Sequence, residues 1–535
     1  MSPVSIEPPH GPHAQIQAPS GTPSGAEARP QDKIVTLDEL SAIVQQLRQV
    51  GKSVVHAHGT FDLLHLGHVR HFQAARELGD VLVVTLTADR FVNKGPGRPV
   101  FSEAARAEML ASLEYVDWIA INYAPDAVDA INRIRPSIYV KGQDYQEPEG
   151  DVTGKIIFER RAVEAHGGRI HFTNEVTFSS TELLNRHFNI YEPHVREHLR
   201  ALRSDGAMAE MLDLIEKVRD YSVVLVGDAI IDEYEYVLPM GKPPKESIIA
   251  ARYHDREIFA GGVFAAANHV ASICAEVDVV TCLGAAGSYE EFIRQNLRPN
   301  VRLHAIYRPS ASTTVKRRLV DPSNMRKLFE VYVMDDEPLM RDLQQELDGM
   351  IARVASQADV TIVTDFEHGL LAPSSIDALV KSARFLAVNT QSNSANWGYN
   401  LITKYPRADY VCIDDPEARL AARDRISKIG DIAHVIEKQI DCAKTIITHG
   451  RYGCVTLERG DIVHTIPALA GRVIDTIGAG DAFLSITAPL VAAGGLLKQV
   501  GFIGNVVGAL KVEIVGHRKA IEKPALIKAI TALLK

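Results

Sequence analysis

The sequence predicts two α/β domains, each built on a parallel sheet and joined by a helical segment. Short apolar runs alternate with helical stretches between about residues 34 and 187, and a second alternation extends from about 220 to 535. A charged stretch with a helical pattern separates them at about 193–219. Because neighbouring parallel strands need long crossover connections, usually helices, each alternation indicates a parallel sheet covered by helices.

Length and composition support more than one globular core and exclude several classes of function. The chain has 535 residues, of which 46% are hydrophobic and 23% charged. A net charge of -9 argues against a nucleic-acid-binding surface, and no apolar stretch reaches the ~20 residues of a membrane span. The five cysteines show no C-x-x-C spacing, so we expect neither a zinc site nor a disulfide framework. This pattern fits a cytoplasmic protein.

We divide the chain into four parts. Residues 1–33 are rich in Pro, Gly and Ser and lack an apolar signal-peptide core, so we expect a disordered tail. Residues 34–190 form the first domain, 191–219 the helical connector, and 220–535 the second domain. The expected strands are short apolar runs at 53–58, 81–86, 116–120, 138–141, 169–172, 222–228, 359–364, 385–389, 410–413 and 445–448, and one clear helix is expected at about 66–78.

A His65-x-Gly67-His68 pattern follows the first strand and opens the first long helix. In open parallel sheets, ligands bind at the carboxyl ends of strands, where helix N-termini offer amides to anions. Gly67 has no Cβ to keep a phosphate from the backbone, and imidazoles one turn apart can stabilise charge that develops on phosphates. Alone, the pattern leaves open the alternative of ordinary surface histidines at a helix start.

The residues around this pattern resemble the cytidylyltransferase-like nucleotidyltransferase family, and within it the adenylyltransferase domain of bacterial ADP-heptose synthesis. Matching stretches begin at Asn93, Val140 and Phe178, and the helix that carries Arg106 also matches. The resemblance implies a Rossmann-like domain in which His65, His68 and Lys94 stabilise the transition state; it leaves ATP and CTP open. The implied nucleotide-binding residues are Gly59, Thr60, Phe61, Asp62, Gly67, Lys141, Ser179, Ser180 and Thr181.

A second motif, Asp-Thr-Ile-Gly-Ala-Gly-Asp at residues 475–481, precedes an apolar helical run. The backbone N–H groups of Gly478, Ala479 and Gly480 can turn inward at the helix N-terminus and form an anion hole for a transferring phosphoryl group. Asp481 would accept the proton of an attacking hydroxyl. The alternative is an ordinary Asp N-cap after a glycine turn.

The second domain resembles the PfkB/ribokinase family of sugar kinases, and in particular the kinase half of the bifunctional heptose enzymes. The resemblance implies a ribokinase-like α/β/α fold, with Asp414 and Glu417 organising Mg²⁺ and phosphates. The implied sugar-binding residues are Asp228, Asp232, Gly261, Gly262 and Lys316. The implied nucleotide and anion-hole residues are Gly478, Ala479, Gly480, Gly450, Gly453, Asn505, Asp414 and Glu417.

This chain departs from that pattern on the sugar side. The heptose kinases carry Gly-Gly-Ala-Ala-Asn where this chain has Gly-Gly-Val-Phe-Ala at 261–265, with Asn268 one helical turn further on. An amide-rich stretch at 389–396 is either a remodelled substrate contact or a polar loop. The domain order is also reversed, because the heptose enzymes carry the kinase first.

We therefore expect a bifunctional enzyme that uses ATP and Mg²⁺, phosphorylates a sugar such as a heptose phosphate, and makes a nucleotide sugar such as ADP-heptose for cell-envelope polysaccharide. The expected partners are sugar phosphates, nucleoside triphosphates and a second copy of the chain, which would dimerise through a β lid near residues 248–259. One alternative is a glycerol-3-phosphate-type cytidylyltransferase with a regulatory kinase-fold domain. Another is a nucleotide-binding scaffold without activity.

Overall fold

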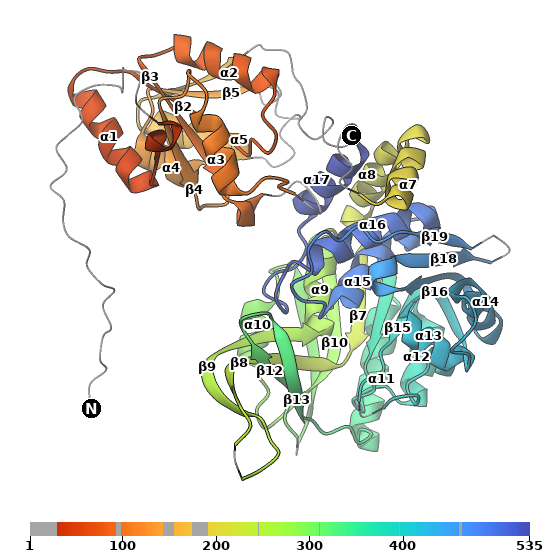
Figure 1. Ribbon diagram of the computed structural model, residues 1–535. Helices are drawn as coiled ribbons and strands as arrows, with labels where there is room; N and C mark the ends of the chain where they lie inside the picture. The colour runs from red at the N-terminus through yellow and green to blue at the C-terminus, as the bar shows by residue number, and fades with distance from the viewer. Residues whose placement is uncertain are drawn as a thin grey trace. The chain divides into compact units, whose positions relative to one another are not determined.

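The computed structural model describes residues 29–92, 98–142, 155–173, 191–243, 245–309, 311–394, 396–459 and 463–535. The chain forms two compact units (Figure 1). Unit 1 comprises Met1–Val92 and Val100–Ser180, and unit 2 comprises Asn93–Pro99 and Thr181–Lys535. Both units are α/β structures, which confirms the predicted fold class.

The described part of unit 1 contains a six-stranded parallel sheet in the order β1-β4-β3-β2-β5-β6. The inner strands β2 and β3 are rich in Val, Leu and Ala and mostly buried, as expected for parallel strands covered on both faces. The strands are β1 (Ile34–Val35), β2 (Val54–Gly59), β3 (Val81–Thr87), β4 (Trp118–Asn122), β5 (Ile138–Gly142) and β6 (Arg169–Thr173).

Helices cover both faces of this sheet. Phe72 of α2 and Leu110 of α3 pack in one core, whereas Leu40 of α1 and Ile134 of α4 pack in another. Residues 30–33, which the sequence assigned to the disordered tail, form η1, because Lys33 Nζ donates to the carbonyls of Leu113 and Val116. The elements are η1 (Pro30–Lys33), α1 (Leu37–Gln49), α2 (Leu66–Glu77), η2 (Asp89–Phe91), α3 (Glu103–Ala111), α4 (Val128–Ile134) and α5 (Lys155–Ala165).

Unit 2 is built on a larger sheet, which among the described residues has nine strands in the order β11-β10-β7-β14-β15-β16-β17-β18-β19. At one edge the β17–β18 and β18–β19 pairs are antiparallel, and the other pairs are parallel. The strands are β7 (Ser222–Gly227), β10 (Glu276–Gly284), β11 (Val301–Arg308), β14 (Val360–Asp365), β15 (Leu386–Thr390), β16 (Arg407–Asp414), β17 (Asp441–Thr448), β18 (Cys454–Glu458) and β19 (His464–Ile466).

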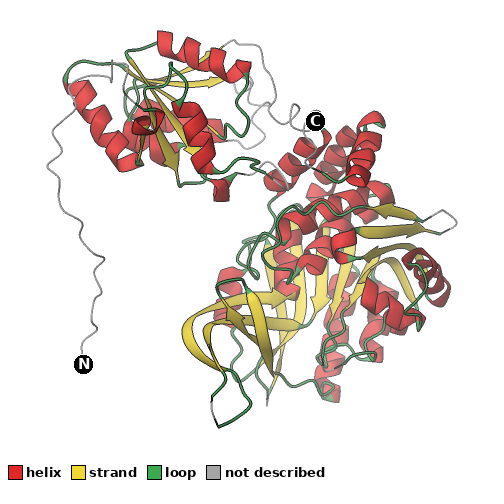
Figure 2. Ribbon diagram, viewed as in Figure 1, coloured by secondary structure: helices red, strands yellow, loops and turns green. Residues whose placement is uncertain are grey.

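A separate small sheet extends from the side of unit 2 (Figure 2), and we call it the lid sheet. Its described strands have the order β13-β12-β8-β9. They are β8 (Ala229–Gly241), β9 (Ala250–Gly262), β12 (Thr314–Asp321) and β13 (Arg326–Val333). The segment expected to supply a β lid therefore does form a strand, β9, antiparallel to β8.

Two layers of helices cover the large sheet of unit 2. Helices α7 and α8, which the sequence predicted as a helical connector, bury Val195, Leu199 and Met211 in the same core as α15, α16 and α17. The helices are α7 (Pro193–Ser204), α8 (Ala207–Lys217), α9 (Val263–Val270), α10 (Glu290–Asn296), α11 (Arg341–Ala355), α12 (Pro373–Ser382), α13 (Asp415–Ala422), α14 (Ile429–Gln439), α15 (Ala479–Ala492), α16 (Leu497–Lys511) and α17 (Lys523–Leu534), with 3-10 turns η5 (Val218–Asp220), η6 (Ile402–Lys404) and η7 (Gly450–Tyr452).

Helix α15 explains why the sequence carries an apolar run directly after the glycine motif. It passes through the core of unit 2, and its residues from Asp481 to Val491 are buried. A helix that is apolar on all sides is stable only when its whole surface is covered. Among the described residues, every helix is nevertheless too short or too polar to cross a lipid bilayer.

Candidate active sites

The first candidate site lies at the carboxyl end of β2, where the chain turns into α2. His65 is the N-cap of α2, and its ring stacks on that of His68 with centroids 3.8 Å apart. Phe61 adopts a left-handed φ of 50° and contacts His68 edge-on, with 5.4 Å between ring centroids. The structure thus brings the two predicted histidines together at a helix N-terminus, where an anion is stabilised.

Two buried side chains hold the loop around these histidines. Oδ1 of Asp62 accepts the backbone N–H groups of Val100 and Phe101, at 2.7 and 3.3 Å. The guanidinium of Arg106, which is fully buried, donates to the carbonyls of Thr60 and Phe101. Asp62 and Arg106 therefore join the loop after β2 to the start of α3, and in this structure Asp62 acts as a loop tether.

Lys141, predicted to neutralise phosphates, makes an internal ion pair. Its Nζ lies 3.0 Å from Oε2 of Glu159, a buried carboxylate that also accepts a hydrogen bond from Tyr139. The lysine sits at the carboxyl end of β5, so it remains on the same edge of the sheet as His65. The other predicted residues of this site, Lys94, Ser179, Ser180 and Thr181, lie outside the described residues.

The second candidate site surrounds Asp481 in the first turn of α15. Gly478 is the N-cap of this helix, with a left-handed φ of 74° that favours glycine. Asp481 is 6% exposed, and burial raises the pKa of its carboxyl above the ordinary value. Nε2 of Gln391, just after β15, donates to Oδ1 of Asp481 at 2.6 Å. The predicted base is therefore buried, has a raised pKa, and is held by an amide donor.

Two aspartates form the floor of this site at the ends of β7 and β14. Burial and the nearby charge of Asp365 raise the pKa of Asp228 to about 7, although it accepts the backbone N–H of Phe366 at 2.8 Å. Asp365 is bound by the hydroxyl of Tyr405 at 2.6 Å and by Nζ of Lys404 at 2.7 Å. Asp365 is thus neutralised by its neighbours, whereas Asp228 keeps capacity to bind hydroxyl groups.

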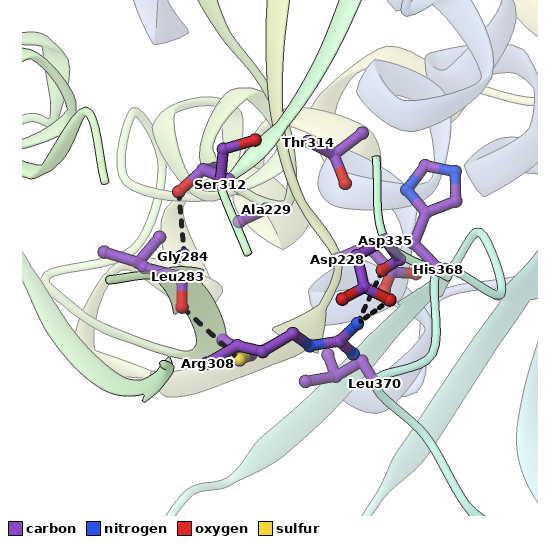
Figure 3. A pocket seen from close by; sticks show the side chains of 12 residues that line it. Asp228, Ala229, Leu283, Gly284, Arg308, Ser312, Thr314, Asp335, His368 and Leu370 are labelled. Atoms are coloured by element: carbon purple, nitrogen blue, oxygen red, sulfur yellow. Dashed lines mark hydrogen bonds and ion pairs between the residues drawn. The ribbon is translucent and has the colours of Figure 1, made fainter. Parts of the chain in front are cut away.

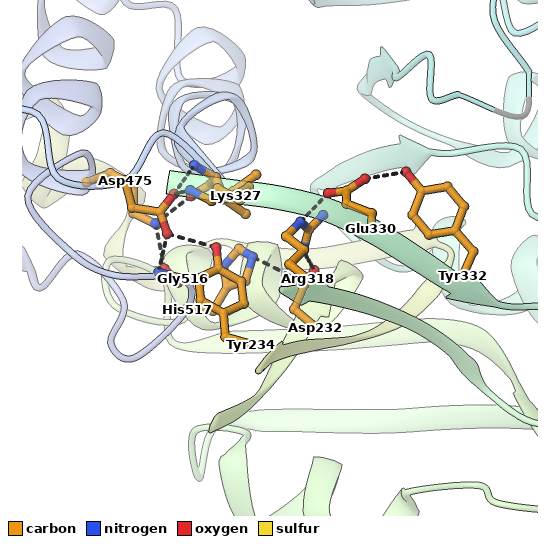
Figure 4. Close-up of polar contacts among 11 residues, drawn as sticks. Asp232, Tyr234, Arg318, Lys327, Glu330, Tyr332, Asp475, Gly516 and His517 are labelled. Carbon is orange, nitrogen blue, oxygen red and sulfur yellow. Dashed lines mark hydrogen bonds and ion pairs between the residues drawn. The ribbon is translucent and has the colours of Figure 1, made fainter. Parts of the chain in front are cut away.

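Asp232 lies on β8 of the lid sheet, beside Arg318 and His517 (Figure 4). It forms an ion pair with Arg318 of β12, and Nε2 of His517 lies 3.3 Å from its Oδ2. Although burial opposes ionisation, the charge of Arg318 holds the pKa of Asp232 well below its usual range. A Cβ on Gly261 would come within 1.9 Å of the same carboxylate, which explains the glycine there.

Lys316 is the second cation on this face of the lid sheet. Its Nζ lies 5.0 Å from the ring centroid of Phe366 and 5.4 Å from that of Tyr332, in the range of cation–π contacts. The side chain is buried, and burial lowers the pKa of its ammonium. Lys316 and Arg318 therefore place positive charge between the lid sheet and the strand ends.

Asp414 and Glu417 together cap helix α13. The two form a capping box, in which Oε2 of Glu417 accepts the N–H of Asp414 at 2.9 Å, while Oε1 accepts the N–H of Ser392 at 3.1 Å. Burial raises the pKa of Glu417 to about 7. No group of three or more metal-ligating side chains occurs among the described residues. The pair fits Mg²⁺ held mainly by substrate phosphates with one or two carboxylates, and not a metal held by protein alone.

The remaining residues predicted to bind nucleotide shape a turn and a loop. Gly450 and Gly453 have φ values of 50° and 96° in the tight turn between β17 and β18. The carboxamide of Asn505 donates to the carbonyls of Ile466 and Pro467, at 3.1 and 3.0 Å. Both amide hydrogens of Asn505 therefore hold the loop after β19 against α16.

The amide-rich stretch at 389–396 is used mainly to fix the loop after β15. Asn389 donates to the carbonyl of Cys412, and Asn396 donates to the carbonyl of Phe366. Among the described residues of this stretch, Gln391 reaches the predicted base, Asp481, and a dense run of amides was its only signal in the sequence. Asn268 does not replace the missing sugar-loop amide, because its carboxamide binds the carbonyl of Asn296 and the N–H of Arg298.

A polar pocket opens beside Asp228 at the ends of β7, β10 and β11 (Figure 3). Arg308 crosses it and is anchored to Asp335 by an ion pair of 2.9 Å and to the carbonyl of Glu337. Polar side chains of Ser312, Thr313, Thr314 and His368 share the wall with Ala229, Cys282, Leu283, Gly284 and Leu370. Such a lining suits a polyhydroxylated ligand.

Comparison with known proteins identifies both units. Residues 220–524 match the family model described as pfkB family carbohydrate kinase. The chain belongs to this family. Residues 56–186 match the model described as cytidylyltransferase-like, so the pfkB domain follows a cytidylyltransferase-like domain, which confirms both resemblances and the reversed order.

Sequence relatives point in the same direction. Bifunctional protein HldE of Methylobacillus flagellatus is 42% identical over 157 residues, 29% of this chain and 31% of that protein. The HldE protein of Syntrophotalea carbinolica is 40% identical over 163 residues, 30% of this chain and 32% of that protein. The matched residues fall in the cytidylyltransferase-like half of this chain. The match spans about a third of the length of these relatives.

Solved structures also resemble the chain. One is phosphofructokinase-2 from Escherichia coli in complex with substrates and products, which is 13% identical with a TM-score of 0.49 and covers 59% of this chain and 100% of that chain. Another is a ribokinase from Arabidopsis thaliana complexed with ribose and ATP, which is 16% identical with a TM-score of 0.45 and covers 59% of this chain and 99% of that chain.

Proposed function

We propose that this chain is a bifunctional enzyme, a sugar kinase and a sugar-phosphate nucleotidyltransferase, that contributes two steps to the synthesis of ADP-heptose for cell-envelope polysaccharide. The observation that carries the proposal is the pair of phosphate-handling centres in one chain, the stacked His65 and His68 and the buried Asp481 beside Gly478. The cytidylyltransferase-like match and the HldE relatives support the transferase step, and the pfkB family supports the kinase step.

In the kinase step, a sugar hydroxyl attacks the γ-phosphorus of ATP, the bond to the β,γ-bridging oxygen breaks, and ADP leaves. Asp481 takes the proton of that hydroxyl, which requires the carboxylate form of a group whose pKa is raised by burial. The backbone N–H groups of Gly478, Ala479 and Gly480 stabilise charge on the transferring phosphoryl group. Asp228 and the hydroxyl-lined pocket beside it orient the sugar, and Lys316 and Arg318 offset the charge of a sugar phosphate.

In the transferase step, an oxygen of a sugar 1-phosphate attacks the α-phosphorus of a nucleoside triphosphate, and pyrophosphate leaves. His65 and His68 donate hydrogen bonds to phosphate oxygens as charge accumulates, at the helix N-terminus that already favours anions. If the kinase forms a bisphosphate, a phosphatase must act between the two steps. Direct passage of an intermediate from one site to the other is then not part of the proposal.

We propose Mg²⁺ as the divalent ion of the kinase site. Asp414 and Glu417 lie at the end of β16 and the start of α13, and each carboxylate keeps lone pairs beyond the hydrogen bonds that cap the helix. When bound, the ion neutralises phosphate charge. The residues themselves would orient it directly or through water, in keeping with the few carboxylates that Mg²⁺ usually takes from proteins.

We further propose that the lid sheet joins two copies of the chain. Phe329, Val331 and Val333 alternate along β13 and are exposed on one face of that sheet, and Tyr253 of β9 is also exposed. Light scattering should give a dimer mass, and a Phe329→Glu, Val331→Glu double variant should give a monomer. A monomeric wild-type chain would contradict this proposal.

We also propose a cytoplasmic location, in agreement with the five cysteines. All five lie in the described part of the chain, and each is a free thiol.

A matrix of sugar phosphates against ATP and CTP, analysed by mass spectrometry, tests the enzymatic proposal. Heptose phosphate with ATP should gain one phosphoryl group, and heptose 1-phosphate with ATP should yield ADP-heptose and pyrophosphate. Product formation only from CTP would replace the adenylyl step with a cytidylyl step. If no sugar is phosphorylated by the wild-type chain, the kinase proposal is wrong.

A further inference from the structure

Lys511 is a buried cation directly behind the glycine motif. It is the last residue of α16, and its side chain has no solvent exposure. Its Nζ donates to the carbonyl of Ile477 at 2.7 Å and to the carbonyl of Gly516 at 2.8 Å. Burying an ammonium is costly unless hydrogen bonds and opposite charge compensate, so this arrangement demands a structural or functional reason.

The hydrogen bond to Ile477 fixes a peptide unit of the anion hole. In a trans peptide the carbonyl and the following N–H point in opposite directions. With the carbonyl of Ile477 turned toward Lys511, the N–H of Gly478 is turned away from Lys511. The N–H of Ile477 donates to Oδ1 of Asp475 at 3.1 Å, so both the N–H and the carbonyl of Ile477 are held by hydrogen bonds.

Opposite charge surrounds this ammonium. Asp475 accepts hydrogen bonds from Tyr234 and from the N–H of Gly516, both at 2.8 Å, and forms an ion pair with Lys327 of the lid sheet (Figure 4). Burial lowers the pKa of Lys511 to about 8, and the carboxylates of Asp475, Asp481 and Asp232 act in the opposite direction. The cation Lys327 and the imidazole of His269 also face it.

We propose that Lys511 is a positioning residue for phosphoryl transfer, an internal cation that orients the Ile477–Gly478 peptide so that the N–H of Gly478 faces the transferring phosphoryl group. This inference rests on the proposed kinase function. Lys511 touches neither substrate nor reacting atoms and acts through the backbone. A small cation bound by the same carbonyls of Ile477 and Gly516 would serve the same purpose, which makes the role testable by chemical rescue.

Two substitutions separate charge from volume. Lys511→Met keeps most of the side-chain volume and removes the charge, whereas Lys511→Ala also leaves a cavity lined by two carbonyls. Both should lower kcat for sugar phosphorylation by at least about tenfold, with a smaller change in sugar KM, because one anion-hole donor is displaced. Ammonium ion should restore part of kcat in Lys511→Ala but not in Lys511→Met. The matched control is Lys523→Met, a lysine of the same unit that is paired with Glu216.

Two further measurements test the role of Lys511: the first needs no variant, and the second needs no turnover. In the wild type, kcat should fall as pH rises through about 8, because Lys511 loses its proton there. Binding of ADP with aluminium fluoride, which mimics the transferring phosphoryl group, should weaken in both variants more than binding of ADP alone. Thermal unfolding reports whether each variant is folded.

The outcomes distinguish this inference from the proposed function. An active wild type with unchanged kcat in both variants overturns the role of Lys511 alone, as does a loss in Lys511→Ala that ammonium does not restore. A wild type that phosphorylates no sugar, but whose affinity for ADP with aluminium fluoride depends on Lys511, overturns the proposed substrates and keeps the inference. Absence of both activity and such binding overturns both.

Discussion

Nε2 of Gln391 lies 2.6 Å from Oδ1 of Asp481, although the two residues are 90 positions apart in the chain. The amide donates to a carboxylate that is buried in the first turn of α15. A hydrogen bond to the charged form favours ionisation, and burial opposes it. Gln391 therefore helps to keep Asp481 in the form that can accept a proton.

Replacement of Gln391 by leucine should shift the acid limb of the kinase profile. Loss of the donor raises the pKa of Asp481 further, so the active carboxylate forms only at higher pH, and kcat at neutral pH should fall by about tenfold. The pH dependence of kcat measures this shift. Gln499→Leu is the matched control, since Gln499 makes a 2.6 Å bond to Glu210 in another part of unit 2. An unshifted profile would exclude a role for Gln391.

The two proposed centres should be separable by mutation. Asp481→Asn removes the base and should lower sugar phosphorylation by at least about 10²-fold, while pyrophosphate release by the transferase remains. His68→Ala removes one hydrogen-bond donor to phosphate from the stacked pair. It should lower pyrophosphate release by the transferase, while sugar phosphorylation remains. Both activities are measured on the same preparations. Loss of both activities in either folded variant would rule out two independent sites.

Gly478→Ala should damage the anion hole through geometry alone. Its φ of 74° disfavours any residue with a Cβ, and that Cβ would lie 2.3 Å from Cε1 of His517. We expect kcat to fall by about 10²-fold, as for loss of an oxyanion donor. Gly494→Ala is the control, because Gly494 also has a positive φ but no atom within 4 Å of an added Cβ. The control should lose stability and keep activity.

His269 should make unit 2 sensitive to acid. Burial, together with the charge of Lys511, lowers its pKa to about 3, and its Nδ1 accepts the N–H of Ile521 at 3.0 Å. An unfolded histidine titrates near 6.5, so between about pH 6.5 and 3 the unfolded chain binds a proton that the folded chain does not. The contribution of His269 to stability is therefore complete above pH 6.5 and falls below it, by at most about 1.4 kcal/mol per pH unit.

His269→Gln tests this acid sensitivity. The glutamine can still accept the N–H of Ile521 but does not titrate, so stability measured by urea unfolding should fall less between pH 7 and 5 than in the wild type. His254→Gln, at an exposed position on β9, should leave the slope unchanged. Equal slopes for His269→Gln and the wild type would contradict the prediction.

About half of the described strands were predicted from sequence to within a few residues, whereas β1, β10, β11, β18 and β19 were not expected. The runs at 81–86 and 222–228 became β3 and β7, because strands buried on both faces are predominantly apolar. The lid sheet was harder to predict, and only the segment at 248–259 was expected to belong to a β lid. Its strands carry charged residues such as Arg317 and Glu233, which pair with each other at 3.0 Å and obscure the alternation of a one-sided sheet.

The candidate sites were predictable where their chemistry is local. His65 and His68 lie in one helical turn, and the glycines at 478 and 480 lie beside Asp481. The partners of the predicted residues were not predictable. Lys141 pairs with Glu159, and Asn505 holds the loop after β19. A lysine or an asparagine has the same sequence signal whether it meets a ligand or a neighbouring loop.

The sequence by itself determined two α/β units, two motifs predicted to handle phosphate, and their reversed order, because backbone conformation and strand burial follow from residues close together in the chain. Only the tertiary structure decided which side chains support those motifs. Gln391 reaches Asp481, Lys511 reaches Ile477, and Lys327 reaches Asp475 across 90, 34 and 148 positions. Such pairs depend on how strands and helices pack, and burial then makes each hydrogen bond and charge count for more than it would in water.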